Sequence, residues 1–235
     1  MKEVESQHPP GAVVLITGDT PRFHHLMVSL EALHAPAGSK LFTVQSCNPA
    51  YNSNKGVRLM LDNPDLQWLW IMGDDHCFEG DTLLKLLDTN LDAVVPLTPR
   101  RIYPHDSVLW KEFNPDEGLN SWYTWEEISE FDKPFPVAGA GSAGLLVKRH
   151  VFERMQAPWF RVGQFKSDEL QEDLYFTWRC NRMGFTVHCD PSVLLGHCSY
   201  IAYYPYRKDG VLGVAGNANG HKFQVVAPGH TAVRA

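Results

Sequence analysis

The chain has 235 residues, 44% of them hydrophobic and 20% charged, with a formal net charge of −6 at pH 7. This composition is typical of a soluble globular protein with a sizeable core, and the acidic balance opposes sequence-independent attraction to nucleic acid. No run approaches the roughly 18 to 20 apolar residues of a membrane span. The first 11 residues lack the apolar segment of a signal peptide, so we expect a cytoplasmic protein with no membrane partner.

The first half of the chain alternates short apolar runs with helical patterns. We expect strands at 12–18, 40–46, 66–72 and 92–99, and helices at 22–33, 51–61 and 81–87, the last capped by Gly80 or Asp81. This alternation predicts an α/β fold with a mostly parallel central sheet flanked by helices. Such sheets bind ligands at the carboxyl ends of their strands, which favours the loops at 18–22 and 73–79 as binding sites.

The second half is less regular. Residues 100–136 are rich in aromatics and prolines and resemble an irregular binding loop. Its aromatic side chains, Trp110 among them, could stack on a sugar or an extruded base, although core packing is the commoner role. We then expect a strand, a glycine bend at 139–144, a second strand and a short helix within 135–155. A helix follows at 168–184, then short extended pieces, and finally a polar tail at 200–235 with little periodicity.

The strand at 66–72 runs into the sequence Gly73-Asp74-Asp75-His76. Adjacent carboxylates are costly unless a cation or strong hydrogen-bond donors offset their charge. Carboxylate oxygens suit Mg²⁺ or Mn²⁺, and an added imidazole shifts the preference toward Mn²⁺. The alternative is a solvated loop whose acids cap the next helix. From these residues alone, both interpretations stay open.

The order of three motifs resembles the glycosyltransferase A fold. The motifs are the apolar strand ending in acids, the glycine bend before LLVKRHVFERM, and a helix with Glu172 and Asp173 before GFTVHCDPSVLLGH. Over residues 12–197 the likeness is to family 2 glycosyltransferases and, toward the C-terminus, to polypeptide N-acetylgalactosaminyltransferases. It implies one Rossmann-like domain at 12–199, with a nucleotide-binding half at 12–99 and an acceptor and catalytic half at 100–199. A flexible segment at 1–11 and an extension at 200–235 flank it.

The resemblance implies a divalent cation, Mn²⁺ or Mg²⁺, that bridges the donor's diphosphate. In the family an Asp-x-Asp motif holds this ion; here one register pairs Gly73 with Asp75 and the other pairs Asp74 with His76. Residues two apart on a strand share a face, so the registers predict opposite faces, and we favour Asp75 as a ligand with Asp74 or His76 as its neighbour. His197 matches the family's distal histidine ligand; the alternative is a satisfied buried histidine.

The resemblance also implies the catalytic groups. Asp173 matches the general base of inverting members, and Glu172 is its rival because retaining mucin-type enzymes carry a glutamate at about this place. Inversion and retention therefore both stay open. A solvated helix face is the alternative for the two acids.

Further residues match the family's donor and acceptor contacts. Thr17 and Asp74 would contact the nucleotide, and Arg58 would pair with uracil or diphosphate oxygens. Gly141 and Ser142 lie in the bend that resembles the segment beside the donor sugar and the acceptor. Ordinary turn chemistry at Thr17 and a surface position for Arg58 are the alternatives.

Together these features predict a metal-dependent glycosyltransferase that moves a sugar from a nucleotide sugar, with UDP-sugar the expected donor, to a hydroxyl acceptor. The acceptor, whether protein, glycoside or modified nucleobase, and the oligomeric state stay open. One alternative is a sugar nucleotidyltransferase, which usually carries a glycine-rich basic stretch after the first strand; TGDTPRFHH has one glycine and one arginine. The other is a catalytically silent binding module.

Overall fold

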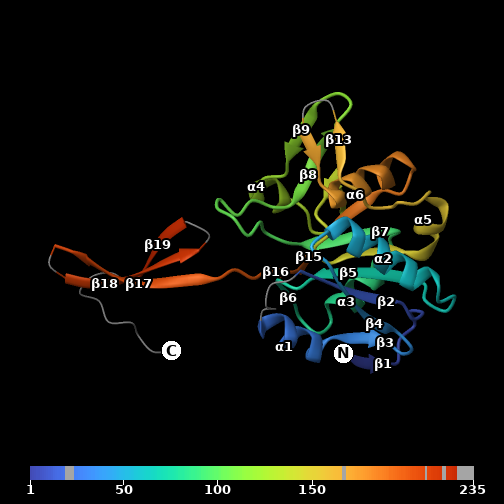
Figure 1. The fold of residues 1–235 in the computed structure, drawn as a ribbon, viewed down its shortest axis with the longest axis horizontal. Coiled ribbons are helices and arrows are strands. Elements are labelled where there is room, and N and C mark those ends of the chain that lie inside the picture. The colour runs from blue at the N-terminus through green and yellow to red at the C-terminus, as the bar shows by residue number, and fades with distance from the viewer. Residues whose placement is uncertain (19–23, 166–167, 210, 219–220, 227–235) are drawn as a thin grey trace.

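The structure, a computed structural model, describes residues 1–18, 24–165, 168–209, 211–218 and 221–226. A seven-stranded sheet in the order β10-β15-β7-β12-β5-β2-β4 forms the centre of the fold (Figure 1). Its strands are β2 (Ala12–Thr17), β4 (Lys40–Gln45), β5 (Trp68–Gly73), β7 (Ala93–Leu97), β10 (Phe135–Pro136), β12 (Leu145–Lys148) and β15 (Val187–Leu194). The four strands expected in the first half are confirmed as β2, β4, β5 and β7.

The central sheet is mixed, so the expectation of a mostly parallel sheet was wrong. Strand β12 lies antiparallel between β5 and β7, and β10 lies antiparallel to β15. The reason is the path of the chain after β7: no helix carries it back to the amino ends of the strands before it re-enters the sheet. A strand that starts at the carboxyl edge must run in the opposite direction.

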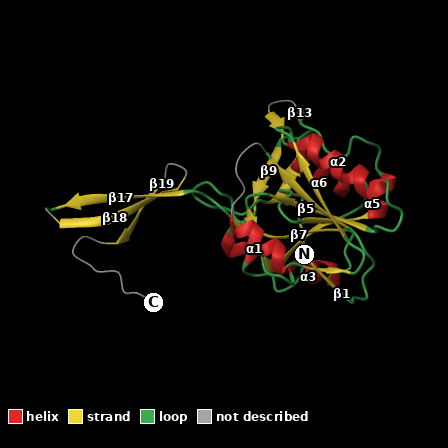
Figure 2. Cartoon of the chain, turned by 60° about the horizontal axis from the view of Figure 1, so that its bottom comes forward, coloured by secondary structure: helices red, strands yellow, loops and turns green. Residues whose placement is uncertain are grey.

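Helices cover both faces of the sheet (Figure 2). Residues of β2 alternate between two buried clusters: Val13 and Leu15 pack with α1 and α3, whereas Ala12 and Val14 pack with α2, α5 and α6. The helices are α1 (His24–Ala32), α2 (Pro49–Leu61), α3 (Thr82–Asp88), α5 (Arg149–Arg154) and α6 (Glu172–Arg182). Burial on both faces explains why these strands read as continuous apolar runs.

Two predicted helix starts differ from the structure. Asp81 occupies the N-cap position of α3, but its side chain makes no capping hydrogen bond and instead pairs with Lys85 at 2.9 Å. The helix expected from residue 168 begins at Glu172, because Asp168–Leu170 forms a strand, β14, paired with β13 (Gly163–Phe165). Its expected end is confirmed: Gly184 has φ of +84°, the left-handed conformation that ends many helices.

The region at 100–136 is more regular than expected. It contains β8 (Leu109–Asn114), β9 (Leu119–Trp122) and α4 (Trp125–Ile128), and β11 (Gly139–Ala140) completes a sheet in the order β11-β8-β9. Trp110 and Trp122 are partners across β8 and β9, with ring centroids 4.2 Å apart. The alternation is hard to see in the sequence because aromatic and polar side chains are mixed along both strands.

Three further pairings complete the fold. Strand β1 (Lys2–Val4), in the segment expected to be flexible, pairs with β3 (His34–Pro36), and β6 (His76–Cys77) pairs with β16 (Gly196–His197). The C-terminal extension, expected to lack periodicity, forms a three-stranded antiparallel sheet of β17 (Ile201–Lys208), β18 (Val211–Ala218) and β19 (His221–Val226). Among the described residues, no helix is both long and apolar enough to cross a membrane.

Arg149 joins the start of α5 to the end of α2. Its guanidinium donates hydrogen bonds to four backbone carbonyls, those of Met60 (3.3 Å), Leu61 (3.0 Å), Asn63 (2.9 Å) and Leu66 (3.1 Å). Carbonyls at the end of a helix lack a full set of partners within the helix. The carbonyls of Met60 and Asn63 also accept backbone N–H groups, so Arg149 adds to their bonds and supplies a donor to those of Leu61 and Leu66.

We expect Arg149→Met to lower the free energy of unfolding by about 2 to 4 kcal/mol, because it removes the charged donor shared by four partly buried carbonyls. Urea denaturation measures the change. Glu153→Gln is the matched control: it removes only the ion pair of Arg149 with a half-exposed carboxylate and should cost less than about 1 kcal/mol. Equal losses in the two variants would contradict the role given to the carbonyl contacts.

Candidate metal centre and active site

Asp75, His76 and His197 form a cluster at the carboxyl end of β5. One possible ligand atom from each lies within 4.8 Å of the others. Asp75 Oδ2 is 3.2 Å from His197 Nε2, and Asp75 Oδ1 is 3.1 Å from His76 Nδ1. A carboxylate and two imidazoles are a suitable ligand set for a divalent transition metal such as Mn²⁺. The predicted ligands Asp75, His76 and His197 are therefore brought together.

Backbone pairing between β6 and β16 builds this cluster from distant parts of the sequence. His197 lies directly opposite His76 in the antiparallel pair, and their rings stack with centroids 4.5 Å apart. The backbone N–H of Cys198 donates to the carbonyl of Asp75 at 2.7 Å, which extends the pairing by one residue. The position of His197 beside Asp75 is thus fixed by main-chain hydrogen bonds.

The hydrogen bonds of His197 are those of a metal-binding histidine or of an imidazolium that donates to Asp75. Its Nδ1 lies 3.1 Å from the carbonyl oxygen of Pro99, which can only accept, so Nδ1 carries a proton. In a neutral imidazole the lone pair of Nε2 then points at Asp75 Oδ2, 3.2 Å away. Two lone pairs at that distance repel unless a metal ion or a second proton lies between them. A backbone carbonyl bound to the other ring nitrogen is also the usual support of a metal-binding histidine.

His76 supports the same interpretation. It is buried, and neither ring nitrogen makes a hydrogen bond among the described residues, although Nδ1 lies 3.1 Å from Asp75 Oδ1. Buried polar atoms without partners are rare and costly. A metal ion bound to one of these nitrogens would remove part of that cost.

The two predicted metal-binding registers assume a continuous strand, but the chain turns at Asp74 and Asp75. Strand β5 ends at Gly73, so the rule that residues two apart share a face stops there. The turn brings the adjacent residues Asp75 and His76 together instead. Gly73 leaves room for them: a Cβ at this position would lie 2.8 Å from His76 Nδ1 and 2.9 Å from Asp75 Oδ1.

Arg101 also contacts the cluster and was missed in the sequence. Its Nη1 donates to Asp75 Oδ2 at 2.6 Å, and its side chain is 43% exposed. Burial by itself raises the pKa of Asp75, but the hydrogen bond from His197 and the imidazole of His76 outweigh it and hold that pKa well below its ordinary range. Asp75 is therefore a carboxylate at neutral pH. The signal for Arg101 was a basic pair, Arg100 and Arg101, directly after a predicted strand.

The predicted catalytic acids lie at the start of α6, beside the glycine bend. Asp173 is partly buried, and its carboxylate accepts hydrogen bonds from the backbone N–H groups of Leu174 (2.7 Å) and Ser142 (3.3 Å). Burial raises the pKa of Asp173, against the effect of these hydrogen bonds. A Cβ on Gly141 would lie 3.6 Å from Asp173 Oδ2. The predicted residues Gly141, Ser142 and Asp173 thus form one group.

Glu172 precedes Asp173 and is buried, with 9% of its surface exposed. Burial, and then the charge of Asp173, raise the pKa of Glu172 to about 7. It is therefore protonated in an appreciable fraction of molecules near neutral pH, unlike Asp75.

The loop at 99–107 connects the two groups of residues. Its first residue, Pro99, accepts from His197, and Pro99 is bridged to Ser107 at the other end. The next residue, Val108, accepts from the N–H of Gly141 in the bend. The metal cluster and the Asp173 group therefore lie at the same edge of the sheet, one near each end of this loop.

The other predicted site residues are distributed more widely. Thr17 is buried at the end of β2, where the pairing of Ile16 with Gly73 brings it next to Asp74. The loop after it, expected to bind ligand, falls mostly on residues 19–22, outside the described residues. Arg58 is exposed in the last turn of α2, which leads away from the carboxyl edge, so it is not brought to the cluster. Trp110 packs on Trp122 and donates to Asn120 at 2.9 Å.

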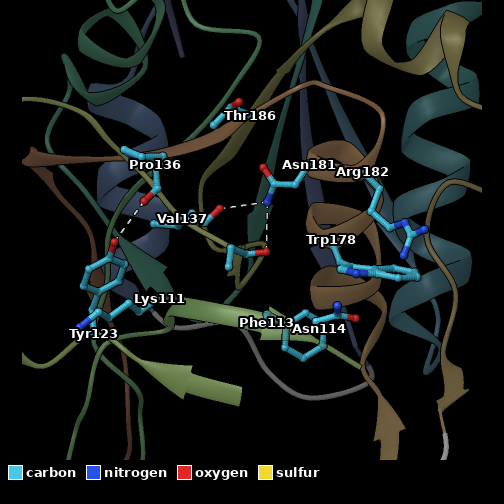
Figure 3. Close-up of a pocket in the computed structure, with 11 residues that line it drawn as sticks. Lys111, Phe113, Asn114, Tyr123, Pro136, Val137, Trp178, Asn181, Arg182 and Thr186 are labelled. Carbon is cyan, nitrogen blue, oxygen red and sulfur yellow. Dashed lines mark hydrogen bonds between the residues drawn. The ribbon is translucent and has the colours of Figure 1, made fainter. Parts of the chain in front are cut away.

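A pocket of about 500 Å³ lies between β8 and α6 (Figure 3). Trp178 and Arg182 line it from α6, and Lys111 and Phe113 line it from β8. Both cations already have partners: Lys111 pairs with Glu127 at 2.6 Å and Arg182 with Asp116 at 3.2 Å. None of the predicted site residues line this pocket, and we assign no ligand to it.

The fold is similar to those of two solved structures. A197 from STIV aligns with a TM-score of 0.53 and 11% identity over 96% of this chain and 97% of that one. GalNAc-T7 with UDP, GalNAc and Mn²⁺ aligns with a TM-score of 0.51 and 10% identity over 87% of this chain and 45% of that one, so the chain spans less than half of its length. No protein-family model and no curated protein matches the sequence. These similarities support the expected glycosyltransferase A-like fold and, at such low identity, show the fold alone.

The contact of Arg101 with Asp75 generates a prediction about metal affinity. A guanidinium on Asp75 Oδ2 competes with a cation for that oxygen and repels it. We therefore expect Arg101→Gln to bind Mn²⁺ more tightly than the wild type without nucleotide, by about 1 kcal/mol or several-fold in Kd. Calorimetric titration with MnCl₂ measures the affinity. His197→Ala should show the opposite change; weaker binding by Arg101→Gln would disprove the competition.

Glu172 generates a prediction about stability and pH. Between its ordinary pKa of 4.5 and its folded value of about 7, the folded protein keeps a proton that the unfolded chain has lost. Stability therefore falls as the pH rises through this window, and the loss is complete above it. We expect wild type to lose up to about 3 kcal/mol relative to Glu172→Gln between pH 4.5 and pH 8. Urea unfolding across that range measures the difference; parallel curves would contradict it.

Proposed function

We propose that the protein is a metal-dependent glycosyltransferase that moves a sugar from a nucleotide sugar, with UDP-sugar as the expected donor, to a hydroxyl acceptor. The observation that carries the proposal is the cluster of Asp75, His76 and His197 at the carboxyl edge of the sheet, connected by one loop to the Asp173 group. Ligand sites of α/β sheets lie at this edge, and a cation and a base can each assist sugar transfer from a diphosphate.

In this proposal Asp75, His76 and His197 hold Mn²⁺ or Mg²⁺. The three residues fit a cation because the buried ring nitrogens of His76 make no hydrogen bond among the described residues, and because Nε2 of His197 faces Asp75 Oδ2 while its Nδ1 is held by the carbonyl of Pro99. The second histidine favours Mn²⁺ over Mg²⁺. A bound divalent ion would neutralise charge that develops on the departing diphosphate.

Asp173 is the proposed base. As the bond between the sugar and the diphosphate breaks, the acceptor oxygen bonds to the anomeric carbon and its proton passes to a carboxylate oxygen of Asp173. The backbone N–H groups of Ser142 and Leu174 hold that carboxylate in place, and its raised pKa makes it a better proton acceptor than an ordinary aspartate. Glu172 would remain the alternative proton carrier.

The nucleotide would lie along the ends of β2 and β5, against Thr17 and Asp74, with Gly141 and Ser142 beside the sugar. A second pocket, of about 600 Å³, offers a place for the acceptor next to the loop at 99–107. Trp122, Trp125 and Glu126 line it, and the guanidinium of Arg100 lies 5.0 Å from the centroid of the Trp122 ring. Flat aromatic faces beside a carboxylate are suited to a sugar or another ring with hydroxyl groups. Arg58 is left out of this proposed site.

The test is release of UDP from a panel of UDP-sugars, measured with and without Mn²⁺. We expect slow release that needs the metal and is abolished in Asp75→Ala and His197→Ala. His188→Ala is the matched control and should keep activity: His188, like His76 and His197, is followed by a cysteine, but its ring nitrogen contacts the backbone carbonyl of Thr186 and it lies outside the metal cluster. Asp173→Asn should lower turnover by about 10²- to 10⁴-fold while its Mn²⁺ affinity stays normal.

Two outcomes would overturn the proposal. One is the absence of metal-dependent UDP release from every donor by a folded wild-type protein. The other is normal activity in Asp75→Ala. Pyrophosphate release from UTP and a sugar phosphate would instead identify a nucleotidyltransferase.

A further inference from the structure

The C-terminal sheet of β17, β18 and β19 stands apart from the rest of the protein. Figures 1 and 2 show it to one side of the central sheet and its helices, joined through the segment that follows β16. At its base the ring of His221 stacks on Tyr103 of the loop at 99–107, with centroids 4.1 Å apart. The sheet is therefore attached at one end, and its strands extend away from the body.

The strand register divides the side chains of this sheet into two different faces. Tyr203, Gly216 and Phe223 form one cross-strand row, and Ala202, Asn217 and Lys222 form a row on the opposite side. We define the apolar face by its described hydrophobic side chains: Ile201, Tyr203, Pro205, Val214 and Phe223. The polar face carries Tyr204, Tyr206, Lys208, Asn217 and Lys222.

Apart from its base, where His221 of the same face stacks on Tyr103, the apolar face is open to solvent in a single copy of the chain. Tyr203 is 61% exposed, Ile201 43% and Phe223 36%. An antiparallel sheet with one apolar and one polar face normally buries the apolar one, and three strands need such burial to be stable. Hydrophobic side chains gathered on one exposed surface mark an interaction site rather than ordinary surface.

The shape of this face favours contact with a copy of itself. Ile201, Tyr203 and Pro205 form a ridge along the edge strand β17, whereas their partners in β18 include the small residues Ala218 and Gly216. The ring of Phe223 leans toward Gly216, where a Cβ would lie 2.5 Å from it. The ring of Phe223 thus covers Gly216, and in a two-fold pair the ridge of each copy can lie beside the Phe223 ring of the other, as a self-complementary interface requires.

We propose that the apolar face is a dimer interface, on which the C-terminal sheet of a second copy packs face to face to form a six-stranded β-sandwich. An eight-residue strand is about 26 Å long and three strands are about 14 Å wide. Such a face covers roughly 360 Å². It can form the apolar core of a two-chain interface, and the rim around it would contribute the rest of the about 800 Å² that stable complexes bury on each partner. The dimer does not depend on the proposed glycosyltransferase activity.

The distribution of charge agrees with an apolar partner rather than a polyanion. Lys208 and Lys222 both belong to the polar face, where Tyr204, Tyr206 and Lys222 surround a hollow of about 510 Å³. On the apolar face, Arg207 is the one Lys or Arg among the described residues, and it lies toward the outer end of β17. Two apolar faces can thus meet with little charge to desolvate.

The test uses two neighbouring tyrosines that point to opposite faces. Tyr203 is 61% exposed on the apolar face and Tyr204 is 49% exposed on the polar face. We expect the full-length wild type and Tyr204→Lys to sediment at micromolar concentration as dimers, with twice the 26.6 kDa mass of one chain. Tyr203→Lys should sediment as a folded monomer, because a lysine cannot be buried without a partner.

Phe223→Lys, on the other edge strand of the same face, provides a second variant should Tyr203→Lys not fold, and it should also be monomeric. High salt should leave the wild-type dimer intact, since the interface is apolar. A monomeric wild type would overturn the proposal, as would dimers that survive both Tyr203→Lys and Phe223→Lys. Loss of the dimer in Tyr204→Lys would show that the wrong face was assigned.

Discussion

The site depends on one short backbone pairing, that of β6 with β16. It joins residues 76 and 197 across more than half the chain, and it places two imidazoles and a carboxylate within contact of each other. Loop closure over such a length is entropically costly, and the pairing alone provides few hydrogen bonds to offset it. The central sheet makes the pairing possible, because β5 leads directly into β6 and β15 leads into β16, and both strands end at the same edge.

The mixed strand directions of the sheet affect how much of the chain covers the site. Apart from β10, which enters the sheet beside β15, the chain between β7 and β12 builds the loop at 99–107, β8 and the glycine bend beyond the carboxyl ends of the strands. A fully parallel sheet would have returned the chain to the other edge through a helix and left this side less covered. The antiparallel insertion of β12 therefore accompanies an extra layer of structure over the site.

Much of the first half of the fold could be predicted from the sequence, because its signals are local. Strands buried on both faces read as apolar runs, and α2 was recognised by its helical spacing. The importance of Asp75 followed from its place at the end of such a strand, and that of His197 from the resemblance of the motif around it. These inferences needed no knowledge of which strands are neighbours.

The rest could not be predicted because it depends on contacts between distant residues. The approach of Arg101 to Asp75 requires the turn at residues 74–75 and the loop at 99–107 to be known together. Strands β8, β9 and β17 carry aromatic residues among their polar ones, so period-two alternation is masked in the sequence. The rule that alternate strand residues share a face failed at Asp75 and His76 because the strand ends two residues earlier, at Gly73.

The loop at 99–107 connects the separate parts of the molecule. Pro99 fixes the tautomer of His197, Arg101 pairs with Asp75, and Tyr103 stacks on His221 of the C-terminal sheet. The first two contacts respond to charge at Asp75: a cation on that carboxylate would release Arg101 and strengthen the need for a proton on Nδ1 of His197. The third contact lies only two residues beyond Arg101. This one short loop therefore contacts both the metal cluster and the C-terminal sheet, at positions only two residues apart.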